Sequence, residues 1–359
     1  MPIRSLPVAA LLALAVAVLP SAPGAPAEKT DLPEPFPHPK GYVCYRAAPP
    51  VVIDGDLKDK AWEVAPWTDA FVDIEGDKKP EPRFRTRAKM LWDDEALYIA
   101  AELEEPHLWG TLREHDSVIF RDNDFEVFLD PDGDNHLYGE LELNALNTTW
   151  DLLLTKPYKD GGHAVNAWEI TGLKTAVKLN GTLNDPRDTD KGWTIEIRWP
   201  WKGLTELVSD KAVPLPPKDG DRWRINFSRV EWDTEVADGK YKKTGPTEHN
   251  WVWSPQGVID MHRPERWGYL QFSTAKPGTA ALKPDADWDV RDTLHRAYYA
   301  QKSHFKTHGK YATAAGDLGL KLPPGRLSIG ATRNTFEMTW TEDGKPLYTI
   351  TQDARVRKE

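Results

Sequence analysis

Cysteine is the scarcest residue in this chain, and its near absence removes one source of stability. The 359 residues contain a single cysteine, Cys44, so no disulfide can form within the chain. After the N-terminal segment, no run of apolar residues is long enough to cross a bilayer. We therefore expect a fold that depends on packing and hydrogen bonding, with no membrane span after that segment.

The sequence motifs of common enzymes and cofactor sites are missing as well. We find no GxSxG, P-loop or GxGxxG pattern in the context that those sites require. The ten histidines form no HExxH or paired-cysteine zinc pattern, and no CxxCH haem motif is present. The sequence therefore assigns no catalytic residue, no transition metal and no covalent haem.

The charge balance bears on the class of partner. The chain has 46 Lys and Arg against 56 Asp and Glu, a net charge of −10, and both signs are interspersed. Because proteins bind nucleic acids mainly through clustered basic side chains, a nucleic-acid partner is not expected. Tryptophan is abundant, with 16 residues, and in a β-rich protein most of these rings are expected in the core.

The N-terminal segment has the pattern of a cleaved export signal. Arg4 gives it a positive start, an apolar run covers residues 6–19, and Ala25-Pro26-Ala27 is a small-residue cleavage pattern. The apolar run is too short to span a bilayer, although an uncleaved anchor is the alternative interpretation. Residues 1–27 are therefore predicted to be a signal peptide, and the protein is expected to be secreted or periplasmic.

Most of the remaining chain has the pattern of short strands. Residues 28–50 are rich in proline and are expected to form an extended lead-in. From Val51 onward, short alternating segments are separated by Gly, Pro and Asp, which predicts an all-β, antiparallel β-sandwich over residues 51–273. The expected strands are 87–92, 97–103, 124–130, 137–145, 193–199, 223–230 and 268–272.

The C-terminal residues have a different pattern. Residues 274–287 lack periodicity and are predicted to be a linker. Residues 288–359 are predicted to be a small α+β appendage, with a helix over Asp289–Phe305 and a β-hairpin that turns at Asp343-Gly344. This part is either a separate small unit or a cap on the sandwich.

Five motifs, in order along the chain, are typical of one family. They are Ile53-Asp54-Gly55-Asp56-Leu57 with Ala61-Trp62, 89–93 with Leu97-Tyr98, 122–130, 192–197 with Pro200-Trp201, and 266–270. From about Val51 to Phe272 the chain resembles the family 9 carbohydrate-binding modules, in a longer branch of exported proteins. The resemblance implies a β-sandwich that binds sugar ends or short chains, is often attached to glycan-degrading enzymes, and holds calcium in some members.

The resemblance also implies where a sugar would bind. Members clamp the sugar between two tryptophans, whose positions fall at about Phe120 and Met261 in this chain. A strand carboxylate of the family corresponds to Glu126, and an arginine corresponds roughly to Glu142. Because only Glu126 is retained, the resemblance supports the fold but not the family's usual sugar specificity.

Alternation along two expected strands gives the first candidate site. Leu141 and Leu143 point to the core, so Glu140, Glu142 and Asn144 share the opposite face with Glu126. Carboxylates accept hydrogen bonds from sugar hydroxyls beside an aromatic plate, although a solvated outer face is the alternative. The predicted aromatic plates, which flank loops or strand ends, are Trp251, Trp253, Trp150 and Trp168.

An acidic turn gives a weak calcium candidate. Asp130, Asp132 and Asp134 alternate around Gly133, and oxygen ligands at that spacing can converge on Ca²⁺. The turn lacks the closing glutamate of an EF-hand, and a plain acidic turn is the alternative.

These observations predict an exported, non-catalytic carbohydrate-binding protein whose partner is a glycan, in connection with polysaccharide breakdown. The alternatives are a hydrolytic enzyme that uses the face carboxylates and a sandwich that binds haem non-covalently or acts as a scaffold. A glycosidase needs two carboxylates about 5–9 Å apart across a cleft. Glu140 and Glu142 instead point the same way from one expected strand.

The cleavage prediction can be checked directly. N-terminal sequencing of the exported protein is expected to begin near Glu28, because Ala25-Pro26-Ala27 is the best small-residue site after the apolar run. A protein that retains Arg4 and fractionates with membranes would contradict it.

Overall fold

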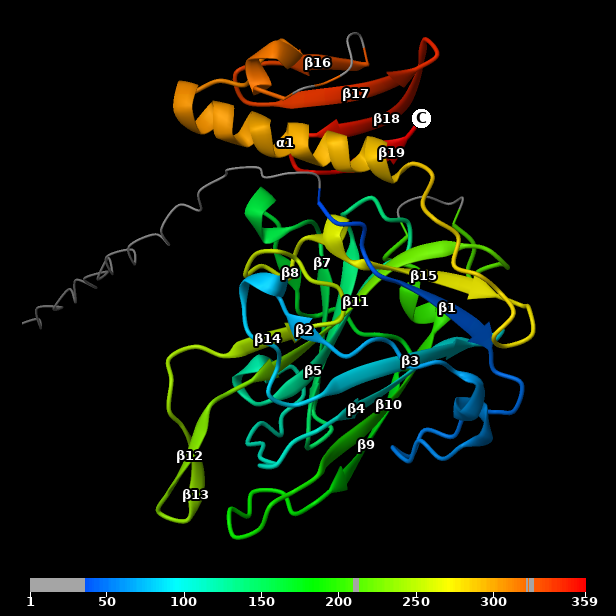
Figure 1. The fold of residues 1–359 in the computed structure, drawn as a ribbon, viewed down its shortest axis with the longest axis vertical. Coiled ribbons are helices and arrows are strands. Elements are labelled where there is room, and N and C mark those ends of the chain that lie inside the picture. Colours follow the sequence, from blue (N-terminus) through cyan, green and yellow to red (C-terminus); the bar gives the residue numbers. More distant parts are fainter. Residues whose placement is uncertain (1–35, 209–212, 321, 323–325) are drawn as a thin grey trace, which may run out of the picture. The chain divides into compact units, whose positions relative to one another are not determined.

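A curled sheet of thirteen strands forms most of the computed structural model (Figure 1). The structure describes residues 36–208, 213–320, 322 and 326–359. The predicted signal peptide, residues 1–27, lies outside these described residues. Within them, no helix is both long and apolar enough to cross a membrane.

The thirteen strands run in the hydrogen-bonded order β8-β7-β6-β5-β11-β15-β1-β3-β4-β10-β9, with β14 paired to β11 and β2 paired to β14. Their bounds are β1 Gly41–Arg46, β2 Val72–Asp73, β3 Thr86–Trp92, β4 Ala96–Leu103, β5 Asp124–Asp130, β6 Tyr138–Asn144, β7 Thr149–Leu154, β8 Ala164–Val165, β9 Lys174–Asn180, β10 Gly192–Pro200, β11 Arg222–Glu231, β14 His249–Val252 and β15 Gly268–Ser273.

Smaller elements connect these strands. A separate hairpin pairs β12 (Thr234–Ala237) with β13 (Lys240–Lys243). The short 3-10 helices are η1 Lys60–Val64, η2 Gly76–Lys78, η3 Ile119–Arg121, η4 Tyr158–Asp160, η5 Trp201–Leu204, η6 Pro264–Arg266 and η7 Ala315–Leu318.

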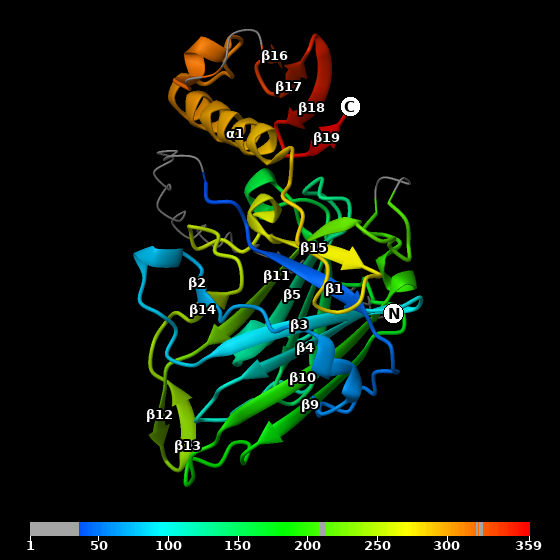
Figure 2. The same cartoon turned by 45° about the vertical axis from the view of Figure 1, so that its right-hand side comes forward.

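Strand β1 joins the two halves of the sheet. It pairs in parallel with β15 on one side and with β3 on the other (Figure 2), whereas the other strand pairs of this sheet are antiparallel. The expected lead-in over residues 28–50 therefore contains a strand, and the sandwich begins at Gly41 instead of Val51. Neighbouring prolines concealed the alternation that buries Tyr42 and Cys44 in the core.

The two halves of the sheet share one main core. Alternate residues of β5 and β6 enter it from one half, and Ile195 and Ile197 of β10 enter it from the other. Fully burying an aliphatic or aromatic side chain contributes about 1.5–3 kcal/mol. Trp92, Trp193 and Trp199 are buried there, in line with the expectation that most tryptophans lie in the core, and the β-sandwich class predicted from the sequence is confirmed.

The first sequence motif of the chain has a structural reason. On the other face of β10, the buried Glu196 carboxylate accepts hydrogen bonds from Trp62 Nε1 (2.6 Å), Asp54 N (2.9 Å) and Gly55 N (2.7 Å). Gly55 has a φ of +82°, and a Cβ there would lie 2.8 Å from Lys178 N, so a larger residue would clash with β9. The motif thus fixes residues 53–62 to the sheet.

The C-terminal part has its own core. Helix α1 (Trp288–His308) packs on a four-stranded sheet of β16 (Leu327–Ala331), β17 (Phe336–Glu342), β18 (Lys345–Thr351) and β19 (Val356–Lys358). Leu294, Met338 and Ile350 are fully buried between the helix and the sheet. The predicted helix and the Asp343-Gly344 hairpin turn are both found, with positive φ at both turn residues.

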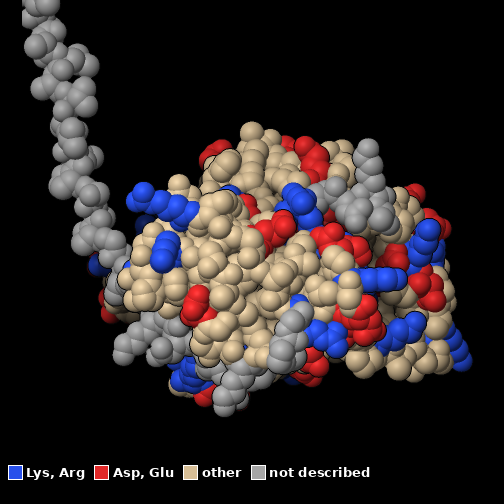
Figure 3. Space-filling view, turned by 90° about the horizontal axis from the view of Figure 1, so that it is seen from above, with Lys and Arg blue, Asp and Glu red and all other residues tan. Residues whose placement is uncertain are grey.

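Polar contacts link the linker and the appendage to the sandwich strands. In the predicted linker, Ala281 O accepts from Gln271 Nε2 at 3.0 Å. In the appendage, Arg355 Nε donates to Asp134 Oδ2 at 2.8 Å, and Tyr299 donates to the buried Glu265. On the face shown in Figure 3, acidic and basic side chains are interspersed.

Because the main core and the appendage core are separate, the domain boundary can be tested. A protein that ends at Ser273 is expected to stay folded, since the main core is complete without α1. Its melting temperature should fall, because Glu265 loses its hydrogen bond from Tyr299 and Asp134 loses its contact with Arg355. Circular dichroism melts of the two lengths measure this, and a molten truncated protein would place the appendage within the folding unit.

Candidate binding cavity on the carboxylate face of the sheet

A cavity of about 210 Å³ lies on the face of β5, β6 and β7 that is turned away from the main core. The cavity contains four of the predicted site residues, Glu126, Glu140, Glu142 and Trp150. It is lined by Phe120, Glu126, Phe128, Glu140, Glu142, Trp150, Leu152, Tyr158, Val230, Glu248, Asn250, Met261 and His262. Strand alternation therefore brings the predicted carboxylates together, as expected from the sequence.

Aromatic rings form part of the cavity wall. The rings of Phe120 and Trp150 lie 6.4 Å apart at 31°, and Phe120 is 38% exposed. Tyr158 is 46% exposed, and its ring meets that of His262 edge-on at 4.4 Å. Trp150 Nε1 is buried and has no hydrogen-bond partner among the described residues. The cavity thus offers apolar ring surface beside polar atoms, as a sugar requires.

The carboxylates of the cavity are crowded and buried. Glu126 and Glu142 face each other across β5 and β6, and their oxygens lie within 4.8 Å of those of Asp124. Glu142 Oε2 accepts from Phe120 N at 2.9 Å, and Asp124 Oδ1 accepts from Val230 N at 3.1 Å. Within the described part of the chain, Asp124 Oδ2 and Glu140 Oε2 accept no hydrogen bond.

Burial shifts the titration of this cluster. Burial raises the pKa of Glu126 to about 7, and burial together with the charge of Glu126 raises the pKa of Glu140 and Glu142 well above their ordinary values. Burial also lowers the pKa of His262 to about 4, so its ring is neutral at pH 7. The cavity therefore combines protonated carboxyl donors with carboxylate acceptors.

Four predicted residues lie elsewhere. Asn144 is fully buried, and its amide bonds to Leu112 O, Asp122 Oδ2, Leu146 N and Thr148 N, so it fixes the loop around it. Trp251 and Trp253 are 3% and 1% exposed and pack on Phe84 and Phe227, because β14 extends the sheet where a loop was expected. Trp168 is 5% exposed. These three rings do not have the free face that stacking on a sugar requires.

The acidic turn makes contacts within the fold. The oxygens of Asp130, Asp132 and Asp134 lie within 4.8 Å of one another. Asp130 accepts from Gly133 N (2.8 Å) and Asn135 N (3.0 Å), and Asp134 accepts from His136 N (2.8 Å) and Arg355 Nε (2.8 Å). The turn therefore has an identified structural role, and calcium binding by it stays a prediction.

Sequence reasoning missed several residues of the cavity. Tyr158, Glu248, Asn250 and His262 come from η4, the segment before β14, β14 itself and the segment before η6. Their only sequence signal was the position of His262 beside Met261. The rest depends on which loops reach this face of the sheet, and strand periodicity does not specify that.

The fold and the cavity define a β-sandwich binding domain, and the sequence assigns its family. Residues 53–271 match the family described as carbohydrate family 9 binding domain-like. The match covers more than half of the chain, so the protein belongs to this family. A comparison with curated proteins found no match.

Solved structures show a distant likeness. A family 9 module from Caldicellulosiruptor kristjanssonii in complex with cellotriose has a TM-score of 0.43 and 17% identity, covering 68% of this chain and 100% of its own. A family 9 module from the same organism in complex with glucose has a TM-score of 0.42 and 18% identity, covering 67% of this chain and 100% of its own. A protein from Bacteroides uniformis, proposed to bind carbohydrate, has a TM-score of 0.47 and 16% identity, covering 66% of this chain and 100% of its own. No ligand is inferred from likeness at this level.

The buried carboxylates make a prediction about pH. Because the pKa of Glu126 is raised in the fold, its contribution to stability is complete below its unfolded pKa of about 4.3 and is lost as the pH rises through about 7. The free energy of unfolding without ligand should therefore fall between pH 5 and pH 8, and Glu126→Gln should reduce that fall. Urea denaturation at both pH values measures this. An identical pH dependence in wild type and Glu126→Gln would contradict it.

Proposed function

We propose that this protein is an exported, non-catalytic binding protein that takes a short glycan or the end of a sugar chain in the Glu126–Glu142 cavity. One observation carries the proposal. Phe120, Met261, Glu126 and Glu142, which the sequence resemblance places at about the clamp, carboxylate and arginine positions of family 9 modules, all line the same cavity. Loops far apart in the sequence are needed to bring them together.

The size and chemistry of the cavity suit a small hydroxyl-rich ligand. Its volume of about 210 Å³ is below the roughly 300–1,000 Å³ of sites for drug-sized molecules, so it suits one or two sugar units. The Phe120 ring offers a stacking surface, and the unpartnered Glu140 Oε2 and Trp150 Nε1 offer an acceptor and a donor. A sugar ring can use both kinds of contact at once.

The charge of the cavity bears on which sugars bind. Glu142 replaces the cation that the family resemblance would place there, and Glu126, Glu140 and Glu248 are further carboxyl groups in the lining. Among the described residues, the lining contains no Lys or Arg to pair with an acidic sugar, and any carboxylate that is ionised would repel it, so a neutral sugar or an amino sugar is the expected class. We also propose that the protein is exported, which the N-terminal pattern supports, and that it acts in connection with polysaccharide breakdown, which the family supports.

Two substitutions test the cavity. At pH 8, above the raised pKa of Glu126, Glu126→Gln removes a charge-assisted acceptor that contributes roughly 1.5–3 kcal/mol, so affinity should fall about tenfold or more. Phe120→Ala removes the proposed stacking ring and should also weaken binding. Its effect on stability should be small, because the ring is 38% exposed. A glycan array identifies the best neutral or amino sugar, and titration calorimetry with that sugar measures both variants.

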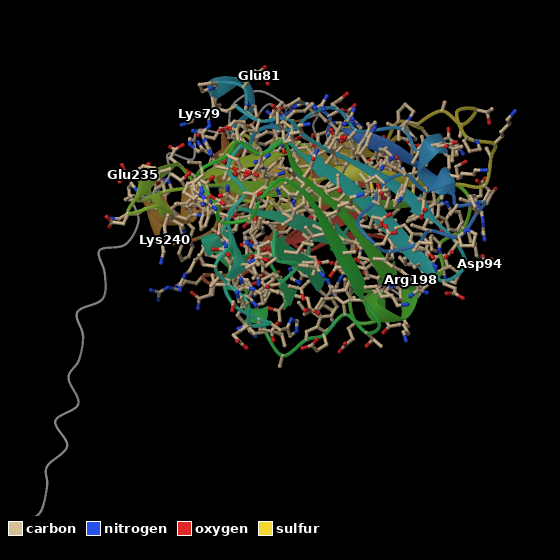
Figure 4. The ribbon with its side chains drawn as sticks, turned by 90° about the horizontal axis from the view of Figure 1, so that it is seen from below. Lys79, Glu81, Asp94, Arg198, Glu235 and Lys240 are labelled. Atoms are coloured by element: carbon tan, nitrogen blue, oxygen red, sulfur yellow. The ribbon has the colours of Figure 1, made fainter. Side chains whose placement is uncertain are left out.

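Glu235→Gln is the matched control. Glu235 is exposed on the β12–β13 hairpin (labelled in Figure 4), where it pairs in register with Lys242, and it lies outside the lining of the cavity. The Glu235→Gln variant should bind the sugar with the same affinity as the wild type. Unchanged affinity in both Glu126→Gln and Phe120→Ala would show that the sugar binds elsewhere.

Melting curves with calcium and with chelator test the acidic turn, because calcium bound to the folded turn would raise the melting temperature by mass action.

A further inference from the structure

A histidine and three carboxylates converge at a second place, apart from the cavity lining. His115 and Asp116 belong to the segment between β4 and η3, Asp151 lies on β7, and Glu169 follows β8. His115 Nε2 lies 3.3 Å from Asp116 Oδ1, 3.7 Å from Asp151 Oδ1 and 3.3 Å from Glu169 Oε1. One ring nitrogen thus faces three separate carboxylates.

The orientation of the imidazole is fixed from its other side. His115 Nδ1 lies 2.9 Å from Thr149 O, and a carbonyl oxygen only accepts, so Nδ1 carries the hydrogen. In the neutral ring, Nε2 then has a free lone pair directed at the carboxylates. Metal-binding histidines are commonly oriented in this way, with the second nitrogen donating to a backbone carbonyl.

Three of the groups have separations that fit a tetrahedral ion. Ligand atoms about 2.0–2.2 Å from a tetrahedral Zn²⁺ lie about 3.3–3.6 Å from one another. His115 Nε2 lies 3.3 Å from Asp116 Oδ1 and 3.7 Å from Asp151 Oδ1, and ligand atoms of these three residues all lie within 4.8 Å of one another. A divalent cation between the three groups would replace close contacts between lone pairs with metal–ligand bonds.

Asp151 provides an independent indication. Its side chain is only 2% exposed, and Oδ2 accepts a hydrogen bond from Ile170 N at 2.6 Å, which fixes the carboxylate. The other oxygen, Oδ1, is buried, points toward His115 and has no hydrogen-bond partner among the described residues. A buried carboxylate oxygen without a partner is costly, and a bound cation would satisfy it.

The alternative is a protonated His115 that pairs with these carboxylates. Partial burial opposes protonation, whereas Glu169 and Asp116 favour it, and the net effect raises the pKa of His115. An imidazolium would nevertheless leave three carboxylates against one positive charge and would leave Asp151 Oδ1 beyond hydrogen-bond distance. A divalent cation offsets more of this charge and can bind Asp151 Oδ1 together with His115 and Asp116.

We propose that His115, Asp116 and Asp151 form a binding site for a divalent transition cation of the Zn²⁺ type, with Glu169 beside it. One nitrogen and two oxygen ligands with an open fourth position suit zinc, and the half-exposed His115 and Glu169 leave the site open to entry. The ion would join the segment before η3 to β7. Phe120 of η3 and Trp150 of β7 line the binding cavity, so the site would stabilise two of its aromatic residues.

Calorimetric titration of the chelator-treated, tag-free protein with Zn²⁺ tests the proposal. The wild type should bind one equivalent at this site and melt at a higher temperature with Zn²⁺ than with chelator. His115→Ala should lose that equivalent and the temperature shift. Asp116→Asn is a second variant, because Asn tolerates the positive φ of 62° at this position, and it should lower the affinity at least tenfold.

Two other histidine variants serve as controls. His163→Ala changes an exposed histidine outside the cluster and should bind Zn²⁺ as the wild type does. The rings of His304 and His308 lie 4.3 Å apart on α1, and such a pair can also bind zinc. The difference in bound zinc between His304→Ala and the wild type measures what this pair binds. No binding by the wild type, or binding that His115→Ala leaves unchanged, would overturn the proposal.

Discussion

The burial of both faces of β5 and β6 is the constraint on which the other features depend. One face carries Phe125, Val127, Leu141 and Leu143 into the main core, where they are fully buried. The opposite face carries carboxyl groups that are also removed from solvent. The apolar packing of the first face stabilises a second face whose charges would otherwise favour exposure. A cluster of buried carboxyl groups can be held in this electrostatically unfavourable state because the core supplies the stability.

The sequence predicted the β-rich part of the fold well, since strand periodicity is a local signal. The alternation in residues 193–199 identified a strand with two buried tryptophans, and Asp343-Gly344 identified a hairpin turn. Strand β1 was missed because a short strand among prolines has too few residues to show a period. Its parallel pairing with β15 and β3 depends on contacts between distant residues, which no local pattern encodes.

The candidate site was predictable in part for the same reason. Glu126, Glu140 and Glu142 followed from alternation, and the structure gathers them in one cavity. Trp251 and Trp253 were misplaced because the stretch around them looked like a loop, although its residues extend the sheet and bury both rings. The His115 cluster combines residues 115, 116, 151 and 169, whose spacing matches no metal motif, so only the folded chain brings them together.

The parallel pairing of β1 has a consequence for the order in which the chain can fold during synthesis. Tyr42 pairs in register with Leu270, so a strand that is synthesised early needs a partner that is synthesised much later. Closing so large a loop is entropically costly and slow. The two halves of the sheet can form from local hairpins while the chain emerges, but β1 can join them only after β15 has appeared. Until then, the edges of β3 and β15 remain unpaired, and a chaperone that protects exposed strand edges would act during this interval.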